Sequence, residues 1–456
     1  MAGVAALLVL YPAFTLAACV AAIALSATMH PDEPLRPARM GTMAIAILIP
    51  LAGPGSYFAN NMENVSLTAT KLVGFLSLGY LIWIKGTSGE AFFHTRQNKL
   101  LLWFGGIILL SYLVNDKSAY AMSAIWGYAT LFLTFFLCVN TLTRPRHIAT
   151  LLALLVIGYL ISISMGVKGL SLDFETAAMR ELANPERLRG ASAGSAVRFG
   201  MGASVCFLLS IYHAASGRKT WQRILAGLAA PVCLYGTVAA YARSVYIATV
   251  AGLLIIAFLL RKRIRLLPVM AGILILLLMV APFIDWVAFV ERIEQIGSSP
   301  AVDRSYSARI SYTMLGLKFW LQSPLIGIGP ARFVDLFGNE TFRFYADTFS
   351  NAGRSLHNMY LSTLCHTGIA GFAVLMMIIT NSFMDLLHVR RHAPDDDRQL
   401  ADYADMIIVA LSVLLIASVF NPTDKFKLIW IMFGLAAALR GMQERRQHDL
   451  SDEYPT

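Results

Sequence analysis

The sequence predicts an all-α protein, a polytopic bundle of about 12 to 13 transmembrane helices. Hydrophobic residues make up 57% of its 456 residues and charged residues only 14%, with a mean hydropathy of +0.63. A soluble domain usually contains about 25% charged residues. Apolar runs of about 18 or more residues, long enough to cross a bilayer as helices, recur along the chain. The runs do not alternate polar and apolar residues, as strands of a membrane barrel do.

The candidate spans divide the chain into three parts. Residues 1–286 hold an N-terminal group of about ten spans, with an outer loop at 167–195. Residues 287–356 form a large loop that mixes aromatic and charged residues, so we expect it to fold into short helices. Residues 357–456 hold the C-terminal helices and a tail. In order, the spans cover 3–28, 40–58, 66–84, 99–115, 119–141, 147–166, 196–215, 222–241, 244–260, 265–286, 357–385, 403–420 and 427–440.

Basic residues in the connecting loops predict the orientation. They cluster in loops at 85–99, 143–147, 217–223, 261–265, 390–399 and 444–447. By the positive-inside rule these loops and the C-terminus face the cytoplasm, and the loops between them, including 167–195 and 287–356, face the other side. The net charge of +10 follows from these loops, so nucleic acid is not an expected partner. The five cysteines lie in apolar runs without ligand spacing, which indicates neither a disulfide framework nor a metal site.

The outer segments nevertheless contain many arginines. These are Arg180, Arg187, Arg189, Arg198, Arg243, Arg292, Arg304, Arg309, Arg332, Arg343 and Arg354. Arg243 lies in the short turn AYARSVY, which is too short to hold it far from the bilayer. Because guanidinium binds phosphate through two parallel hydrogen bonds, the group indicates a phosphate or pyrophosphate site. The alternative is pairing with lipid headgroups or with nearby carboxylates.

The sequence RSLHNMY (354–360) places His357 and Asn358 at the start of an apolar run. A neutral imidazole can accept a proton from a hydroxyl near neutral pH. The alternative is an interfacial histidine that bonds a carbonyl. His366 lies two and a half turns further on the opposite helix face, so we interpret it as a packing residue. The segment SPLIGIGPARF (323–333) predicts a tight turn, because it contains two glycines and two prolines. It is not a nucleotide-binding loop, because no lysine or serine follows in the required spacing.

These pieces together resemble the O-antigen ligase and O-antigen polymerase family of bacterial membrane proteins. The resemblance rests on YARSVYIATVAGL, then ARISYTMLGLKFWLQSPLIGIGPARF, then LHNMYLSTLCHTGIAG. It covers about residues 235 to 375. It extends more loosely to RLRGASAG (187–194), which resembles the family's R-x-x-G segment, although SAGSAV replaces the usual asparagine-rich turn.

The resemblance implies an inner-membrane enzyme that is active on the periplasmic side and needs neither a metal nor a nucleotide cofactor. Such an enzyme transfers a glycan from an undecaprenyl pyrophosphate carrier to an acceptor hydroxyl, which in ligases belongs to lipid A–core. His357 is then the general base, Arg189, Arg243 and Arg309 bind the pyrophosphate, and Asn358 and Tyr360 orient the histidine or the sugar. The segment leaves open whether Arg187 or Arg189 acts. Membrane lipids surround the helices.

Three other functions stay open from the sequence. A polymerase, or a ligase that glycosylates a secreted protein, would use the same chemistry on a different acceptor. A transporter of a lipid-linked anion would place ionisable residues at mid-membrane. The predicted spans contain few such residues, and the charge is concentrated on one side of the membrane, which favours a one-sided active site.

Overall fold

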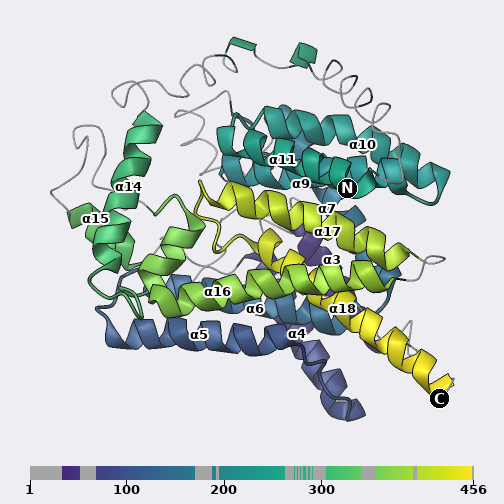
Figure 1. Ribbon diagram of the computed structural model, residues 1–456, viewed down its shortest axis with the longest axis horizontal. Coiled ribbons are helices and arrows are strands. Elements are labelled where there is room, and N and C mark those ends of the chain that lie inside the picture. Colours follow the sequence, from purple (N-terminus) through teal and green to yellow (C-terminus); the bar gives the residue numbers. More distant parts are fainter. Residues whose placement is uncertain are drawn as a thin grey trace.

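The computed structural model describes residues 33–51, 68–169, 187–191, 195–261, single residues between 272 and 290, and residues 304–339, 355–393 and 398–453. The described part of the chain is all-α, as predicted (Figure 1). Its long helices are α3 (Arg36–Leu48), α4 (Ala69–Ser88), α5 (Arg96–Val114), α6 (Ala121–Thr141), α7 (Pro145–Val167), α9 (Ala196–Ser216), α10 (Thr220–Val238), α11 (Arg243–Leu260), α14 (Arg304–Trp320), α15 (Arg332–Asn339), α16 (Met359–His392), α17 (Gln399–Ser418) and α18 (Lys427–Glu453). The predicted span 3–28 and most of 265–286 lie outside the described residues.

Successive helices of the bundle run in opposite directions, so their termini gather at two ends of the bundle. We call one of these the arginine end. The helices that begin there are α4, α6, α9, α11, α16 and α18, and those that end there are α3, α5, α7, α10 and α17. Contacts between loops and helix termini identify this end. For example, Asn421 after α17 donates to Ser244 at the start of α11 over 3.0 Å, and Tyr360 at the start of α16 donates to Leu415 near the end of α17 over 3.1 Å. The described parts of the loops predicted to face outward therefore lie at this end.

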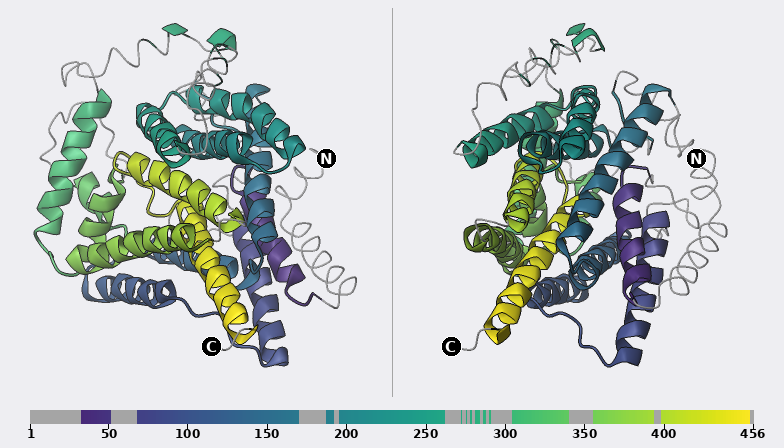
Figure 2. Two further views of the ribbon diagram at one scale, coloured as in Figure 1. Left: turned by 45° about the vertical axis from the view of Figure 1, so that its right-hand side comes forward. Right: turned by 90° about the vertical axis from the view of Figure 1, so that its right-hand side faces the viewer.

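Helix α17 occupies the centre of the bundle. It packs against α11, α16, α9 and α18, and in Figures 1 and 2 it lies between the α9–α11 group and the α16–α18 group. Of its most apolar stretch, 83% is buried inside the protein, against 28% for α5 at the periphery. Because α17 contacts both groups, it sets the positions of the helix N-termini on its two sides relative to each other.

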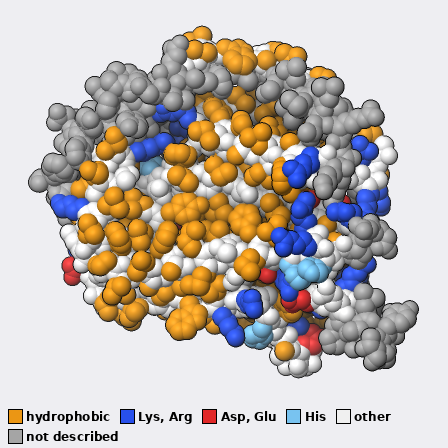
Figure 3. All heavy atoms as spheres, in the orientation of Figure 1, with side chains coloured by type: hydrophobic (Ala, Val, Ile, Leu, Met, Phe, Trp, Pro, Cys, Tyr) orange, Lys and Arg blue, Asp and Glu red, His pale blue; other side chains and the backbone are white. Residues whose placement is uncertain are grey.

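The surface around the bundle is apolar. Leu102, Trp103, Leu228 and Leu254 are all more than 60% exposed, and Figure 3 shows a continuous band of hydrophobic side chains. Among the described residues, seven helices are long and apolar enough to span a membrane: α5, α6, α7, α9, α11, α16 and α17. An exposed band of this size is unfavourable in water and favourable in a bilayer, so the protein is a multi-pass membrane protein.

Several helix boundaries differ from those predicted, and three of the differences are described here. Helix α3 ends at Leu48, just before the PLAGPG sequence, where proline and glycine interrupt helices. The helix that follows His357 begins at Met359, so the histidine itself lies outside it. The last helix was predicted to be short, at 427–440, but α18 continues as 27 residues to Glu453, beyond the apolar part of its sequence.

Candidate active site

The first arginine segment, residues 187–191, lies against the turn between α10 and α11. The Leu188 N–H donates to the Ala239 carbonyl over 2.8 Å, and Arg187 Nε donates to the Ala240 carbonyl over 3.1 Å. Ala240 is three residues before Arg243. These two bonds therefore bring the RLRG segment and the Arg243 turn together, although more than fifty residues separate them.

Gly190 allows this segment to approach the bundle so closely. Its φ is +68°, in the left-handed region that favours glycine. A Cβ built there would lie 2.4 Å from the Phe199 ring and 2.4 Å from Ser162 Oγ. Ser162 Oγ also accepts the Ala191 N–H over 2.9 Å. The glycine of the R-x-x-G pattern thus sets the position of the arginines, which are both half-buried.

The turn that carries Arg243 holds Tyr241 in a rare conformation. Tyr241 has a φ of +45°, which is unfavourable for a residue with a side chain and is often found at functional sites. Its N–H donates to the Val238 carbonyl over 2.9 Å, and the Tyr246 hydroxyl donates to the same carbonyl over 2.7 Å. The turn is therefore fixed by bonds from both of its sides.

Arg243 is the first residue of α11 and is half-buried. The N-terminus of a helix carries partial positive charge, so an arginine there is unfavourable unless an anion is bound. The Arg243 side chain and the N-terminus of α11 therefore both contribute positive electrostatic potential at the same place. The loop between α17 and α18 reaches the same place, since Asn421 bonds Ser244 over 3.0 Å and Arg198 donates to the Pro422 carbonyl over 3.0 Å.

His357 is held by an aromatic contact with α14. Its ring stacks on Tyr312, with the ring centroids 5.1 Å apart and an interplanar angle of 16°. Tyr312 is buried and packs against Phe337 of α15, with ring centroids 5.2 Å apart. Arg309 lies one helical turn before Tyr312, and residues three apart share a helix face. The structure thereby places the helix face of Arg309 next to the imidazole of His357.

The two predicted orienting residues hold the start of α16. Asn358 is the N-cap, and its Oδ1 accepts the Leu361 N–H over 3.0 Å. The Tyr360 hydroxyl donates to the Leu415 carbonyl of α17 over 3.1 Å. Both side chains act on the helix terminus, so any orienting effect on His357 passes through the backbone that immediately follows it.

The glycine-rich turn 323–333 docks into a break in α16. Gly368 interrupts the helix with a φ of +65° and a ψ of −170°. The Ile328 N–H donates to the Cys365 carbonyl over 3.0 Å, and the Ile369 N–H donates to the Pro324 carbonyl over 2.9 Å. The tight turn was predicted from the sequence, but its docking against α16 was not. These bonds join the end of α14 to α16, and so fix Tyr312 over His357.

Glycine is required on both sides of this contact. A Cβ at Gly327 would lie 2.4 Å from the carbonyl carbon of His366, and a Cβ at Gly368 would lie 2.3 Å from that of Leu325. The His366 carbonyl also accepts Ser111 Oγ over 2.8 Å. His366 therefore belongs to the packing that supports the site, in agreement with its interpretation from the sequence.

The arginine half (187–191 and Arg243) and the histidine half (Arg309, Tyr312 and His357) lie on either side of the end of α17. The α17 terminus contacts the start of α16 through Tyr360, and the loop that follows contacts the start of α11. In Figure 3, lysine or arginine side chains gather beside a histidine in the region between α14 and α11. Both halves thus belong to one end of the molecule. Sequence reasoning missed Tyr312 and Asn421, and it included Arg198 only among the outer arginines. The one-turn spacing from Arg309 was a signal for Tyr312.

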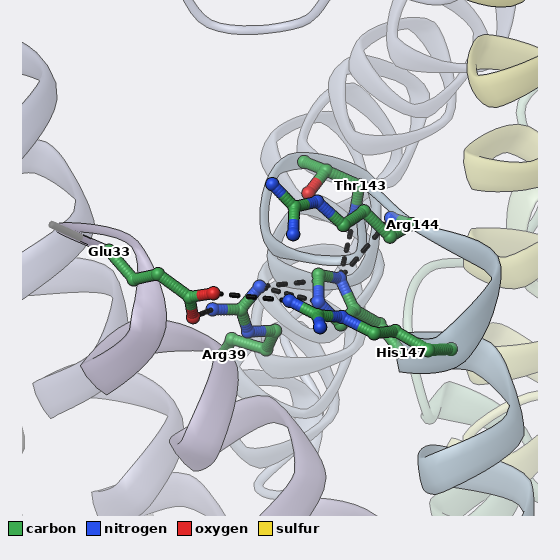
Figure 4. A network of polar contacts seen from close by, with 6 residues as sticks. Glu33, Arg39, Thr143, Arg144 and His147 are labelled. Atoms are coloured by element: carbon green, nitrogen blue, oxygen red, sulfur yellow. Dashed lines mark hydrogen bonds and ion pairs between the residues drawn. The ribbon is translucent and has the colours of Figure 1, made fainter. Parts of the chain in front are cut away.

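The opposite end holds a polar network of a different kind (Figure 4). Arg39 is 8% exposed. It donates to Glu33 over 2.7 Å, and its Nη1 lies 2.6 Å from Nε2 of His147. Arg146 also donates to Glu33, over 3.1 Å. Arg39 beside it holds the pKa of the Glu33 carboxyl below its ordinary value. The one carboxylate of Glu33 thus offsets part of the charge of both arginines, and the network joins α3 to α7.

Comparison of the chain with known protein families gives one match. Residues 228–376 match the family described as O-antigen ligase. The matched segment contains Arg243, Arg309, the glycine-rich turn and His357, and the segment 187–191 lies outside it. No curated protein matches the chain.

Proposed function

Because the chain belongs to the O-antigen ligase and polymerase family through residues 228–376, we propose that it is an O-antigen ligase. It transfers a glycan from undecaprenyl pyrophosphate to a hydroxyl of lipid A–core, on the periplasmic side of the bacterial inner membrane. The observation that carries this proposal is the gathering of the Arg187–Arg189 segment, Arg243, Arg309 and His357 at one end of a membrane-spanning bundle. A pyrophosphate-linked donor needs cations, and an acceptor hydroxyl needs a base.

The reaction breaks the bond between the anomeric carbon and the pyrophosphate oxygen. His357 accepts the proton of the acceptor hydroxyl, whose oxygen attacks the anomeric carbon from the face opposite the pyrophosphate. The electron pair of the broken bond leaves on the phosphate oxygen, and the anomeric configuration inverts. A positioned base of this kind contributes about 10²–10⁴-fold to the rate.

The arginines stabilise the charge that develops on the leaving pyrophosphate. Arg189 and Arg243 approach it from the α10–α11 side and Arg309 from α14, with Arg187 as a second candidate in the first segment because its side chain reaches the same turn. Groups that are already in place when charge develops contribute on the order of 3 kcal/mol each. The backbone bonds of Arg187 and the start of α11 at Arg243 provide such fixed positions.

Tyr312 has two effects on the base. Its ring fixes the plane of the His357 imidazole, and its face stabilises the imidazolium that forms when the proton is accepted, because an aromatic face attracts a cation. Nδ1 or Nε2 of the ring then points away from the stack, in the ring plane, toward the acceptor.

In vitro transfer by the purified protein tests this function. The protein is mixed with an undecaprenyl-pyrophosphate-linked glycan and lipid A–core, without added metal, and the product is followed by gel mobility and mass spectrometry. We expect glycan on lipid A–core. Joining of two lipid-linked repeat units instead would identify a polymerase, and transfer to a secreted protein would identify a protein ligase. Movement of the intact lipid-linked glycan between leaflets, without bond cleavage, would identify a transporter and overturn the enzyme assignment.

A further inference from the structure

A cavity of about 360 Å³ lies toward the opposite end of the bundle, away from the candidate active site. Helices α7 and α10 form its two sides, and α9 and α17 form its floor. The floor is closed, since Leu209 is 2% and Met406 5% exposed. The sides are open, since Ile157 of α7 is 45% and Leu225 of α10 is 56% exposed. The cavity, which we call the α7–α10 cavity, therefore opens sideways onto the apolar surface of the bundle.

The cavity exists because α7 and α10 touch near the arginine end and leave space between them toward the opposite end. A Cβ at Gly236 would lie 2.7 Å from the Ile163 side chain, so the two helices are in close contact there. Toward the opposite end, alanines line the space: Ala149 of α7, and Ala226 and Ala229 of α10. Alanine leaves a volume that a leucine would fill. A volume of this size is typical of ligand-binding cavities.

The cavity extends through the depth of one leaflet of a bilayer. On α7 its lining runs from Ala149, near the start of the helix, to Leu160. From residue 149 to residue 160 the helix rises about 16 Å. Half of the hydrocarbon core of a bilayer is about 15 Å thick. An acyl chain of a lipid in this leaflet therefore fits along the length of the cavity.

The polar part of the cavity wall lies at the helix termini, where lipid headgroups are. Trp221 and Gln222 are the second and third residues of α10, and His213 lies three residues before the end of α9. Tryptophan is typical of the interface between membrane and water. Further in, the wall is formed by apolar residues such as Val156 and Leu160. The cavity thus changes from polar to apolar with depth, as a lipid does from its headgroup to its chain.

A buried hydroxyl in the cavity wall also indicates a ligand. Ser210 lies one turn further in than His213 on α9, lines the cavity and is 3% exposed. Within the described part of the chain, the Ser210 hydroxyl makes no hydrogen bond. An unbonded hydroxyl is unfavourable in a cavity that opens to hydrocarbon. The ester carbonyl of a lipid, which lies between headgroup and chain, would accept a hydrogen bond from it.

An arginine lies beside the polar mouth of the cavity. Arg223 Nε donates to the Ala214 carbonyl over 3.0 Å, the kind of contact that Arg187 makes at the arginine end. A Cβ at Gly217 would lie 3.0 Å from Arg223 Cγ and 3.3 Å from the His213 ring. Arg223 and the imidazole of the cavity wall therefore lie next to each other. The backbone carbonyl fixes the guanidinium and carries no net charge of its own.

The described residues around the mouth carry more positive than negative charge. Arg218, Lys219 and Arg223 lie in and directly after the turn between α9 and α10, and all three are exposed. The carboxylate near His213 is Asp402 of α17. Guanidinium binds phosphate through two parallel hydrogen bonds. The charge at the mouth is therefore complementary to an anionic phospholipid headgroup.

We propose that the α7–α10 cavity binds one anionic phospholipid from the leaflet at the opposite end. One acyl chain fills the space between α7 and α10, the Ser210 hydroxyl donates to its ester carbonyl, and Arg223 and Gln222 hold the phosphate. The polyprenyl donor fits less well. Its pyrophosphate lies at the other end in the proposed function, so its chain would bring a terminal methyl group to the polar mouth. The bound phospholipid joins α7 to α10 where the two helices do not touch.

Native mass spectrometry of the purified, delipidated protein tests this site. The protein is titrated with phosphatidylglycerol, and we expect one tightly bound molecule per chain. Arg223→Gln should weaken binding by about tenfold, the loss expected for a charge-assisted hydrogen bond. Ala226→Leu should weaken it by about tenfold as well, because the larger side chain occupies the space of the acyl chain. Phosphatidylethanolamine, which carries no net charge, should bind wild type about tenfold more weakly than phosphatidylglycerol.

Two matched controls lie outside the cavity. Ala129→Leu adds the same side chain at an exposed position of α6. Arg261→Gln removes an exposed arginine at the same end, where its guanidinium lies 4.0 Å from the centroid of the Phe258 ring. Both variants should bind phosphatidylglycerol like wild type. Equal affinities of wild type and Ala226→Leu, at an unchanged melting temperature, would overturn the site. Equal affinities for the two phospholipids would overturn the anionic ligand.

Photolabelling of the wild-type protein makes the test independent of how the variants fold. Phosphatidylglycerol with a diazirine at the end of one acyl chain is bound and activated by light, and labelled residues are located by peptide mass spectrometry. We expect label on the deep wall, at Leu160, Leu209 and Ala229. Label spread over exposed residues such as Leu102 and Leu254, without enrichment in the cavity, would mean surrounding bilayer lipid and would overturn the site. Displacement of the label by undecaprenyl phosphate and not by unlabelled phosphatidylglycerol would assign the cavity to the donor chain and would also overturn it.

Discussion

The two ends of the bundle hold their basic side chains in different ways. At the opposite end, three arginines form ion pairs with carboxylates: Arg39 with Glu33 at 2.7 Å, Arg390 with the buried Asp405 at 2.6 Å, and Arg440 with Glu444 at 2.7 Å. At the arginine end, Arg332 also lies near carboxylates, but Arg187 and Arg198 donate to backbone carbonyls. A carboxylate offsets the charge of an arginine, whereas a backbone carbonyl fixes the position of the guanidinium and carries no net charge of its own. The first arrangement stabilises helix packing, and the second prepares a surface for an anion.

Removing the base should have the largest effect on activity. His357→Ala removes the proton acceptor and should lower transfer by about 10²–10⁴-fold, with an unchanged amount of protein in the membrane. His392→Ala is the control, because this exposed histidine lies at the opposite end and its side chain contacts the His388 carbonyl of its own helix over 2.9 Å. Initial rates of product formation measure both. A His357→Ala variant with normal transfer would mean that the base lies elsewhere.

Arginine-to-lysine substitutions test the difference between the ends directly. Arg243→Lys keeps the charge and loses the two-point contact with phosphate, so transfer should fall by about 10²-fold, the scale seen for loss of one stabilising donor. Arg332→Lys is the matched control, because Arg332 lies at the same end but near the carboxylates of Asp116, at 3.4 Å, and Asp335, at 3.5 Å. It should retain most of the activity. Equal losses in both variants would remove the distinction between Arg243 and an arginine that lies beside carboxylates.

The glycine contact between the turn 323–333 and α16 should affect stability more moderately. Gly368→Ala places a Cβ 2.3 Å from the backbone of Leu325 at a φ of +65°. Strain at such a residue costs on the order of 1–3 kcal/mol, and α14 must shift away from His357. We expect a lower melting temperature together with a lower kcat.

Gly79→Ala is the control for this substitution. Gly79 lies inside α4, and a Cβ there has no neighbour within 4 Å. The melting temperature should stay the same or rise slightly, since alanine favours a helix. If Gly368→Ala melted like Gly79→Ala, the docking of the turn into α16 would not be the contact that holds α14 in place.

The sequence predicts the helices well and their breaks less well. Length and hydropathy locate α5, α6, α7, α9, α11, α16 and α17, because each of these long apolar runs meets the requirement of the bilayer directly. The break at Gly368 lies inside an apolar run, and hydropathy does not detect it. Its cause is the backbone of Leu325, more than forty residues earlier, which is a tertiary contact.

The candidate site shows the same limit. The charge rule identified the arginines as residues out of place, and the resemblance joined them to His357. Neither indicated that the RLRG segment bonds Ala239 and Ala240, or that Tyr312 stacks on His357. These contacts depend on how α14 and residues 187–191 fold back on the bundle, and a single sequence carries no periodic signal for that. The roles of Arg189, Arg243, Arg309 and His357 remain predictions, and the substitutions above test those of Arg243 and His357.

The smallest effect should come from the helix cap next to the base. Asn358→Ala removes the bond from the Leu361 N–H and should destabilise the start of α16 by about 1 kcal/mol. Because this start fixes the backbone of His357, kcat should fall several-fold and KM for the donor should stay unchanged. Asn358→Asp restores the cap acceptor and should restore most of the activity. If Asn358→Asp were as inactive as His357→Ala, the amide itself would contact the sugar, and the cap would not be the main role of this residue.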